Sequence, residues 1–179
     1  DKSLSIRWAL LSSQSLKKSR SSNLLLSEDV MSTLNCLKKL GVKVKISKNF
    51  CEIIGLGLNG FKYKKNLTLN AGNSGTFGRL ILGLLVHSKK EIRIKGDKSL
   101  SKRDFLRVIK PLEKFGAKFN SNYGKLPIRI QGTNNSKPIK YYENKGSAQC
   151  KSAVMFAALN TQGETIIKAK KSRDHSELL

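Results

Sequence analysis

Gly72-Asn73-Ser74-Gly75-Thr76 is a loop of small residues that leads into the apolar run Arg79-Leu80-Ile81-Leu82. The same order occurs at Asp1-Lys2-Ser3-Leu4-Ser5-Ile6-Arg7 and at Gly146-Ser147-Ala148-Gln149. Arg7, Arg79 and Ser152 follow at spacings of 72 and 73 residues (79 − 7 and 152 − 79). Such loops leave backbone N–H groups free at a helix N-terminus, where anions bind. They therefore predict three repeats that present their helix starts to one anionic ligand.

A second, amphipathic helix follows the first two loops. Apolar positions three and four residues apart over 30–40 predict it, and the run at 105–115 aligns with that segment. Ser27 is its expected N-cap. Gly41 and Gly116 are the expected C′ glycines that end the two copies.

Alternating strands follow each of these glycines. Segments 42–46 and 50–54 predict one hairpin, and 117–119 with 128–130 predict another across a loop that holds Gly124 and Pro127. Weaker or shorter strands are predicted at 19–25, 91–95 and 164–168. The pattern predicts an α/β fold of repeated βαβαββ units. About two and a half units are expected, covering about 1–71, 72–145 and 146–179.

Composition excludes several classes of protein. Hydrophobic residues make up 39% of the 179 residues, which suffices for a core, but no apolar stretch is long enough to span a membrane. The three cysteines have no metal-ligand spacing, so we expect packed thiols, no metal site and a cytoplasmic location. Because the third unit stops partway and the chain starts inside a motif, we expect a fragment of a longer protein.

The net charge of +23 indicates an anionic partner. The lysines are spread along the chain, and no aromatic-rich strand of the kind that stacks bases is present. The charge is compatible with a solvated surface, with a funnel for a small anionic substrate, or with a basic RNA-binding module. We expect no nucleic-acid partner and keep the RNA-binding module as an alternative.

Six segments occur in a family-specific order over essentially the whole chain. They are the three loops above, Ser27-Glu28-Asp29-Val30, Gly96-Asp97-Lys98-Ser99-Leu100 with Arg103, and Ser172-Arg173-Asp174-His175-Ser176-Glu177. Together they resemble the 5-enolpyruvylshikimate-3-phosphate (EPSP) synthase family of the shikimate pathway.

The resemblance implies transfer of the enolpyruvyl group of phosphoenolpyruvate to the 5-hydroxyl of shikimate 3-phosphate, with release of phosphate. Members have two similar domains, each with three βαβαββ units, and no cofactor. The chain would be an incomplete N-terminal domain, inactive alone, with the second domain absent. The full-length protein is expected to be a monomer in the cytoplasm, serving aromatic amino-acid biosynthesis.

The resemblance also implies roles for individual residues. Lys2 would lie between both substrates and act in catalysis. Gly75 would place its backbone against phosphoenolpyruvate, and Arg103 would bind that substrate. The expected ligands of shikimate 3-phosphate are Ser3, Arg7, Ser147, Ala148, Gln149 and Ser172, with Arg173 as an assistant.

Four positions depart from the family pattern. The family commonly has His where Ile6 stands, Pro where Asp104 stands, and Thr-Met where Phe77-Gly78 stands. Asp104 adds a negative charge that could pair with Arg103 and weaken anion binding. The nearest enzymatic alternative is UDP-N-acetylglucosamine enolpyruvyl transferase, but its Lys-Asn pair is Lys2-Ser3 here and its loop cysteine motif is absent.

Overall fold

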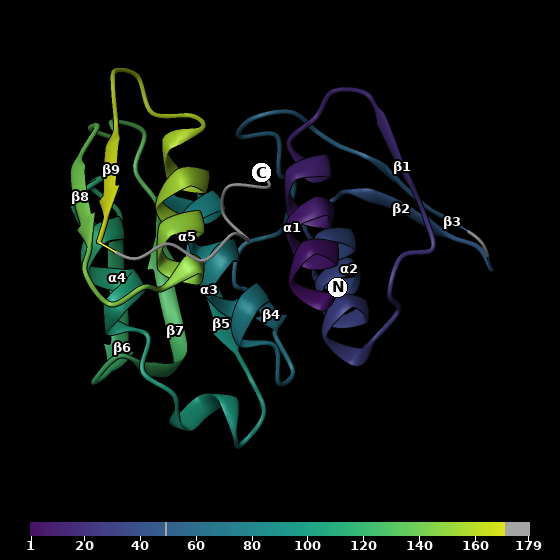
Figure 1. Cartoon of the computed structure of the whole chain (residues 1–179), viewed down its shortest axis with the longest axis horizontal. Coiled ribbons are helices and arrows are strands. Elements are labelled where there is room, and N and C mark those ends of the chain that lie inside the picture. The colour runs from purple at the N-terminus through teal and green to yellow at the C-terminus, as the bar shows by residue number, and fades with distance from the viewer. Residues whose placement is uncertain (49, 171–179) are drawn as a thin grey trace.

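Three β-sheets form the outer surfaces of the molecule, and the α-helices lie between them (Figure 1). The computed structural model describes residues 1–48 and 50–170. The described α-helices are α1 (Lys2–Ser13), α2 (Glu28–Lys39), α3 (Gly75–Leu84), α4 (Leu106–Glu113) and α5 (Ala148–Ala158), with short 3-10 helices η1 (Leu85–His87) and η2 (Leu100–Lys102). The described strands are β1 (Lys18–Ser22), β2 (Lys43–Ile46), β3 (Phe50–Ile54), β4 (Leu67–Asn70), β5 (Ile92–Lys95), β6 (Lys118–Asn122), β7 (Lys125–Gln131), β8 (Lys140–Glu143) and β9 (Ile166–Ala169).

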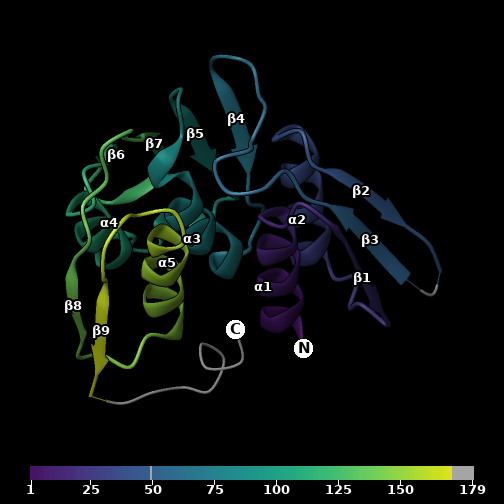
Figure 2. The same cartoon turned by 90° about the horizontal axis from the view of Figure 1, so that it is seen from above.

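The second sheet contains a complete βαβαββ unit. Its strand order is β4-β5-β7-β6, with β4 parallel to β5 and β7 antiparallel to both neighbours. The first sheet, β1-β3-β2, repeats the antiparallel part, and the third, β8-β9, repeats the parallel pair. Figure 2 shows the three sheets arranged around the helices. The predicted α/β class is confirmed.

Strand pairing bears on where the units begin. β4 ends at Asn70 and pairs with β5, while β8 ends at Glu143 and pairs with β9. Boundaries at 72 and 146 would separate both strands from their own sheets. We therefore propose that the second and third units begin at Leu67 and Lys140.

The three helix starts share one capping bond. The side chains of Asp1, Ser74 and Ser147 each accept a hydrogen bond from the backbone N–H three residues later, at 2.8, 3.2 and 3.2 Å. These caps are 73 residues apart in both intervals (74 − 1 and 147 − 74). The repeat is therefore set by the N-caps of α1, α3 and α5.

This register corrects the predicted first loop. Residues Lys2 to Arg7 are helical, because Asp1 caps the chain at its first residue. The equivalent of Arg79 and Ser152 is then Ile6, one residue before Arg7. The expectation that Pro127 lies in a loop is also wrong, because it lies within β7, next to the irregular pairing at Asn120 and Asn122. A proline is tolerated there because no regular ladder bond requires its missing N–H.

The second helix agrees with its predicted pattern. Its inward face, formed by Val30, Leu34, Leu37 and Leu40, is fully buried. Gly41 has a φ of +89°, which suits glycine at the C′ position. Ser27 occupies the N-cap position, but its hydroxyl makes no capping bond and is buried without a partner among the described atoms.

Close packing of α3 on α5 holds these two helices, and so their capped N-termini, next to each other. Gly83 lies so near α5 that a Cβ there would be 2.1 Å from the Ala153 carbonyl oxygen and 3.1 Å from the Phe156 Cβ. Both helices are almost entirely buried in the core. The backbone of α5 therefore has no room for a larger residue at position 83.

We predict that Gly83→Ala lowers the free energy of unfolding by about 2 kcal/mol or more, because α3 and α5 must separate to admit the methyl group. Chemical denaturation monitored by circular dichroism measures this change. Asn35→Ala, on the exposed side of α2, is the control and should leave stability nearly unchanged. An unaltered midpoint for Gly83→Ala would contradict this close packing of the two helices.

Candidate functional site

A pocket of about 320 Å³ opens where the first turns of α1 and α5 meet. Cations and small polar groups form its wall. The lining residues are Ser3, Arg7, Arg107, Lys145, Gly146, Ser147, Ala148 and Gln149. Because this lining holds three cations and no carboxylate, the pocket is suited to an anion with more than one negative charge.

Arg7 is the buried charge of the pocket, with only 2% of the residue exposed. Its Nε and Nη2 donate to the Ser152 hydroxyl of α5 at 3.3 and 3.2 Å, and Nη1 donates to the Ser3 carbonyl at 3.2 Å. Burial lowers the pKa of Arg7, yet a guanidinium stays protonated at neutral pH. None of the ion pairs among the described residues includes Arg7, so no carboxylate there neutralises it.

Glu143 organises the opposite wall. This buried carboxylate accepts from the Tyr141 hydroxyl and from the Lys145 backbone N–H at 2.8 Å, and it lies 3.9 Å from Arg107 Nη2. Burial and the bond to Glu143 raise the pKa of Tyr141, so its hydroxyl remains a donor. The carboxylate thus fixes the strand end that carries Lys145 into the pocket.

Arg107 and Lys145 are pocket residues that the sequence patterns did not predict. Lys145 immediately precedes the Gly146-Ser147 loop, and this adjacency was the available signal. Arg107 follows Arg103 by four residues, but no local pattern shows that α4 faces α5. Both residues also border a neighbouring groove of about 440 Å³ that holds Lys110, Lys114 and Lys140.

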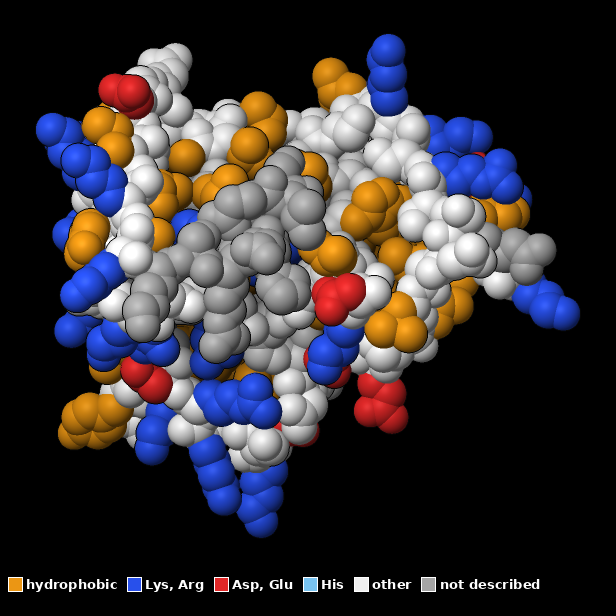
Figure 3. All heavy atoms as spheres, viewed as in Figure 1, with side chains coloured by type: hydrophobic (Ala, Val, Ile, Leu, Met, Phe, Trp, Pro, Cys, Tyr) orange, Lys and Arg blue, Asp and Glu red, His pale blue; other side chains and the backbone are white. Residues whose placement is uncertain are grey.

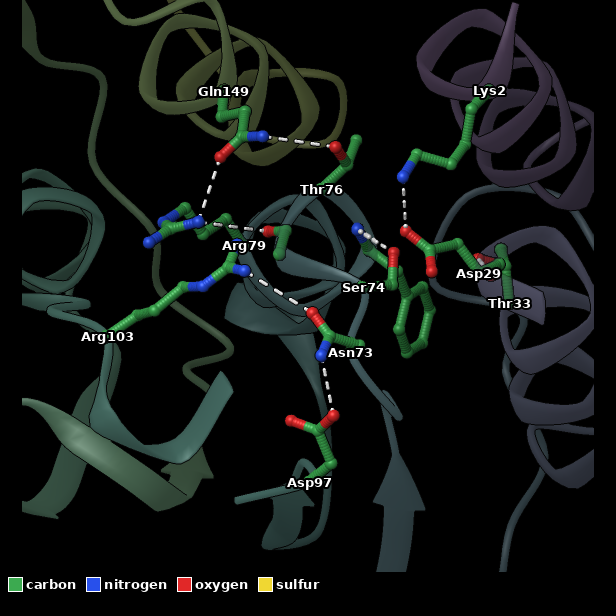
Figure 4. Close-up of polar contacts among 12 residues, drawn as sticks. Lys2, Asp29, Thr33, Asn73, Ser74, Thr76, Arg79, Asp97, Arg103 and Gln149 are labelled. Atoms are coloured by element: carbon green, nitrogen blue, oxygen red, sulfur yellow. Dashed lines mark hydrogen bonds and ion pairs between the residues drawn. The ribbon is translucent and has the colours of Figure 1, made fainter. Parts of the chain in front are cut away.

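A second cationic cluster lies on the other side of Gln149 (Figure 4). Arg79 Nη1 donates to Gln149 Oε1 at 3.0 Å, and Gln149 Nε2 donates to the Thr76 hydroxyl at 3.0 Å. Arg103 Nη2 donates to Asn73 Oδ1 at 3.3 Å. The two clusters therefore meet at one glutamine, which also lines the pocket.

Gly75 lies against the guanidinium groups of this second cluster. A Cβ at Gly75 would lie 2.9 Å from Arg79 Nη1 and 3.1 Å from Arg103 Nη1. Glycine thus allows two guanidinium groups to approach the N-terminus of α3. Burial is the main cause of the lowered pKa of Arg79, and the positive charge of Arg103 lowers that pKa further.

The remaining predicted residues lie apart from these clusters or outside the described residues. Lys2 Nζ forms an ion pair with Asp29 Oδ2 at 3.1 Å and does not line the pocket (Figure 4). Ser172 and Arg173 lie outside the described residues. The predicted pocket group of Ser3, Arg7, Ser147, Ala148 and Gln149 is brought together, while Gly75 and Arg103 form the neighbouring cluster.

The expected pairing of Asp104 with Arg103 is wrong. Asp104 Oδ1 instead accepts from the Leu106 backbone N–H at 2.7 Å, and the Asp104 carbonyl accepts from Arg79 Nη2 at 3.1 Å. This local bond to the first residue of α4 satisfies the carboxylate at shorter range in the sequence than an ion pair would. No ion pair within the described part of the chain links it to Arg103.

The wider surface agrees with an anion-binding function. Figure 3 shows Lys and Arg side chains on both sides of the visible face, with few acidic side chains between them. Among the residues described, no group of three His, Cys, Asp or Glu side chains is placed to hold a metal ion. None of the described helices combines the length and apolar character needed to cross a membrane.

A repeated βαβαββ architecture with a cationic pocket between two helix N-termini defines an α/β protein whose pocket is suited to small multivalent anions. The family model of EPSP synthase (3-phosphoshikimate 1-carboxyvinyltransferase) matches residues 1–179. The chain therefore belongs to the EPSP synthase family.

Individual relatives agree with this assignment. The 3-phosphoshikimate 1-carboxyvinyltransferase of Vesicomyosocius okutanii is 45% identical over 178 residues, and that of Caldicellulosiruptor saccharolyticus is 41% identical over 182. The structure of EPSP synthase from Acinetobacter baumannii matches 99% of the chain with a TM-score of 0.92 and 35% identity. The chain spans 41%, 42% and 40% of these three proteins, respectively.

The three thiols are buried in the core. Cys36, Cys51 and Cys150 are buried and unpaired. Burial raises the pKa of Cys36 to about 11 and also raises the pKa values of Cys51 and Cys150. Since the thiolate is the reactive form, raised pKa values keep all three protonated near neutral pH.

We predict that Cys36, Cys51 and Cys150 of the folded protein react with an aromatic disulfide reagent at pH 8 at least ~100-fold more slowly than after unfolding, because burial limits both ionisation and access. Mass spectrometry of peptides measures each site separately. The same protein in denaturant is the control. Rapid labelling of Cys150 in the folded protein would show that it is exposed at the pocket instead.

Proposed function

We propose that the protein containing this chain transfers the enolpyruvyl group of phosphoenolpyruvate to the 5-hydroxyl of shikimate 3-phosphate and releases phosphate. Family membership and the activity for which the relatives are named support this reaction. For this chain, the observation that carries the proposal is Arg7. It is a buried cation without a carboxylate partner among the described residues, and it opens onto a pocket flanked by Ser3 and Ser147.

The proposed site for shikimate 3-phosphate is this pocket. Its phosphate would be held by Arg7 and the hydroxyls of Ser3 and Ser147, near the positive ends of α1 and α5. The backbone of Ala148 and the amide of Gln149 would contact the ring, since an amide both donates and accepts. Lys145 and Arg107 would increase the local concentration of the anion.

Phosphoenolpyruvate would bind beside the N-terminus of α3. Gly75 lets two guanidinium groups approach the helix start there, and the fork of Arg103 suits a carboxylate or a phosphate. The two anions would then lie on either side of Gln149. This arrangement brings the reacting groups together, which is the main contribution that positioning makes to catalysis.

Lys2 is the proposed catalytic residue of this chain. It sits in the first turn of α1, and its ammonium is half-exposed beside Asp29. When two anions enter, the ammonium would move from Asp29 to the space between them. A cation there stabilises charge that develops during transfer.

Other parts of the proposal concern the whole protein. Ser172, assisted by Arg173, would contribute to the shikimate phosphate site. A second domain would complete the active site, and the full-length protein would act as a cytoplasmic monomer without a cofactor. The buried, unpaired thiols are compatible with a reducing compartment.

We predict that Arg7→Gln weakens binding of shikimate 3-phosphate to the full-length protein by roughly 30-fold or more, because charged hydrogen bonds are lost in a buried site. Isothermal titration calorimetry measures the dissociation constant. Arg93→Gln, an exposed arginine on β5, is the matched control and should bind normally. Equal affinity of both variants would remove Arg7 from the site.

A second experiment separates the alternative functions. We expect phosphate release from phosphoenolpyruvate with shikimate 3-phosphate by the full-length protein, but no turnover by the 179-residue chain alone, because half of the catalytic groups would be missing. Turnover by the short chain would contradict this division of the site. Turnover with UDP-N-acetylglucosamine instead would favour the related transferase. Salt-dependent RNA binding without a response to shikimate 3-phosphate would favour the RNA-binding module.

A further inference from the structure

Gln149 owes its position to a residue outside the pocket. Arg79 does not line the pocket, but it donates to Gln149 Oε1, while Thr76 receives the Gln149 Nε2 hydrogen bond. These two bonds fix which end of the amide is oxygen and which is nitrogen. The orientation that Gln149 presents to a ligand therefore depends on where Arg79 is held.

Arg79 is held by an aromatic ring as well as by hydrogen bonds. Its guanidinium carbon lies 4.8 Å from the centre of the Phe105 ring. Its other acceptors are the carbonyl groups of Gly75 and Asp104, at 3.3 and 3.1 Å. All of these partners are uncharged, so a planar surface under the guanidinium contributes to its orientation.

The ring of Phe105 packs directly against the backbone of Gly78. The ring is fully buried, and a Cβ at Gly78 would lie 3.4 Å from both the Cε1 and Cζ atoms. A methyl group there would be in van der Waals contact with the ring, and a longer side chain that extended toward the ring would displace it. Gly78 is also a departure from the Thr-Met that the family commonly has at 77 and 78.

We propose that Gly78 and Phe105 form a positioning pair that holds Arg79, and through it Gln149, in the orientation that binds shikimate 3-phosphate. The proposal rests on the proposed function of the pocket. The proposal also explains why residue 78 departs from the family pattern: the small glycine and the large ring of Phe105 pack together. Neither residue touches the ligand, since neither lines the pocket.

The test uses the full-length protein with Phe105→Leu, Gly78→Met and the double variant. Phe105→Leu removes the ring, and Gly78→Met displaces it. We expect each single variant to raise the dissociation constant for shikimate 3-phosphate by roughly fivefold, equivalent to about 1 kcal/mol, with a smaller change in kcat. In the double variant, methionine occupies the space of the lost ring, and we expect affinity to return to within about twofold of the parent.

Phe115→Leu is the matched control, because it removes another fully buried ring at the far end of α4. It should lower the melting temperature about as much as Phe105→Leu but leave the dissociation constant unchanged. Calorimetry, KM and kcat for each substrate, and thermal unfolding supply the measurements.

The outcomes separate two conclusions. If the parent protein binds shikimate 3-phosphate but Phe105→Leu alters only the melting temperature, Phe105 is a core residue and the positioning proposal is wrong. The positioning proposal is also wrong if the double variant binds no better than either single variant. If the parent protein does not bind shikimate 3-phosphate at all, the proposed function fails, and this inference fails with it.

Discussion

The bond between Arg7 and Ser152 is the constraint on which the rest of the site depends. A guanidinium that is 2% exposed and has no carboxylate partner among the described residues is costly to bury. The Ser3 carbonyl of the same helix and the Ser152 hydroxyl of α5 recover part of that cost, and the bond to Ser152 forms only where the starts of α1 and α5 approach each other. The bond joins residues 145 positions apart, so the fold has to be complete before this charge is accommodated. An anion in the pocket would supply the remaining compensation.

The capping bond shared by α1, α3 and α5 explains why the starts of α1 and α5 can border one pocket. Asp1, Ser74 and Ser147 each satisfy one backbone N–H at a helix start through the same kind of bond. The same cap at the same interval brings equivalent turns to one region, as the bond between Gln149 and Thr76 shows for α5 and α3. The positive ends of neighbouring helices are thus adjacent. Their mutual repulsion favours a bound anion, whereas an isolated helix start would give only a weak preference.

The sequence predicted the elements well and the contacts between distant segments poorly. Local signals sufficed for the buried face of α2, for Gly41 and for the two hairpins, because helical and strand periodicities are visible in a single segment. The loops around Ser74 and Ser147 were recognised for the same reason. Arg107 was missed because its place in the pocket depends on how α4 packs against its neighbours. The pairing of Asp104 with Arg103 does not form because the backbone N–H of Leu106 binds the same carboxylate, a competition that the composition does not reveal. The segment predicted as the first loop is instead the first turns of α1, which begins at Lys2 because Asp1 is its N-cap.

The distribution of carboxylates explains how the site stays cationic. Asp97 accepts from the Leu100 backbone and from Asn73, and Asp104 accepts from the Leu106 backbone at the start of α4. Glu143 accepts from the Lys145 backbone and from Tyr141, and its distance to Arg107 is 3.9 Å, too long for a strong bond. Each of these carboxylates therefore shapes a backbone segment around the arginines, and none of them directly neutralises Arg7, Arg79 or Arg103. Acidic residues that served as close ion-pair partners would have stabilised the empty protein at the expense of ligand binding. Because these carboxylates bind backbone N–H groups, they order the loops while the arginines remain available for anions.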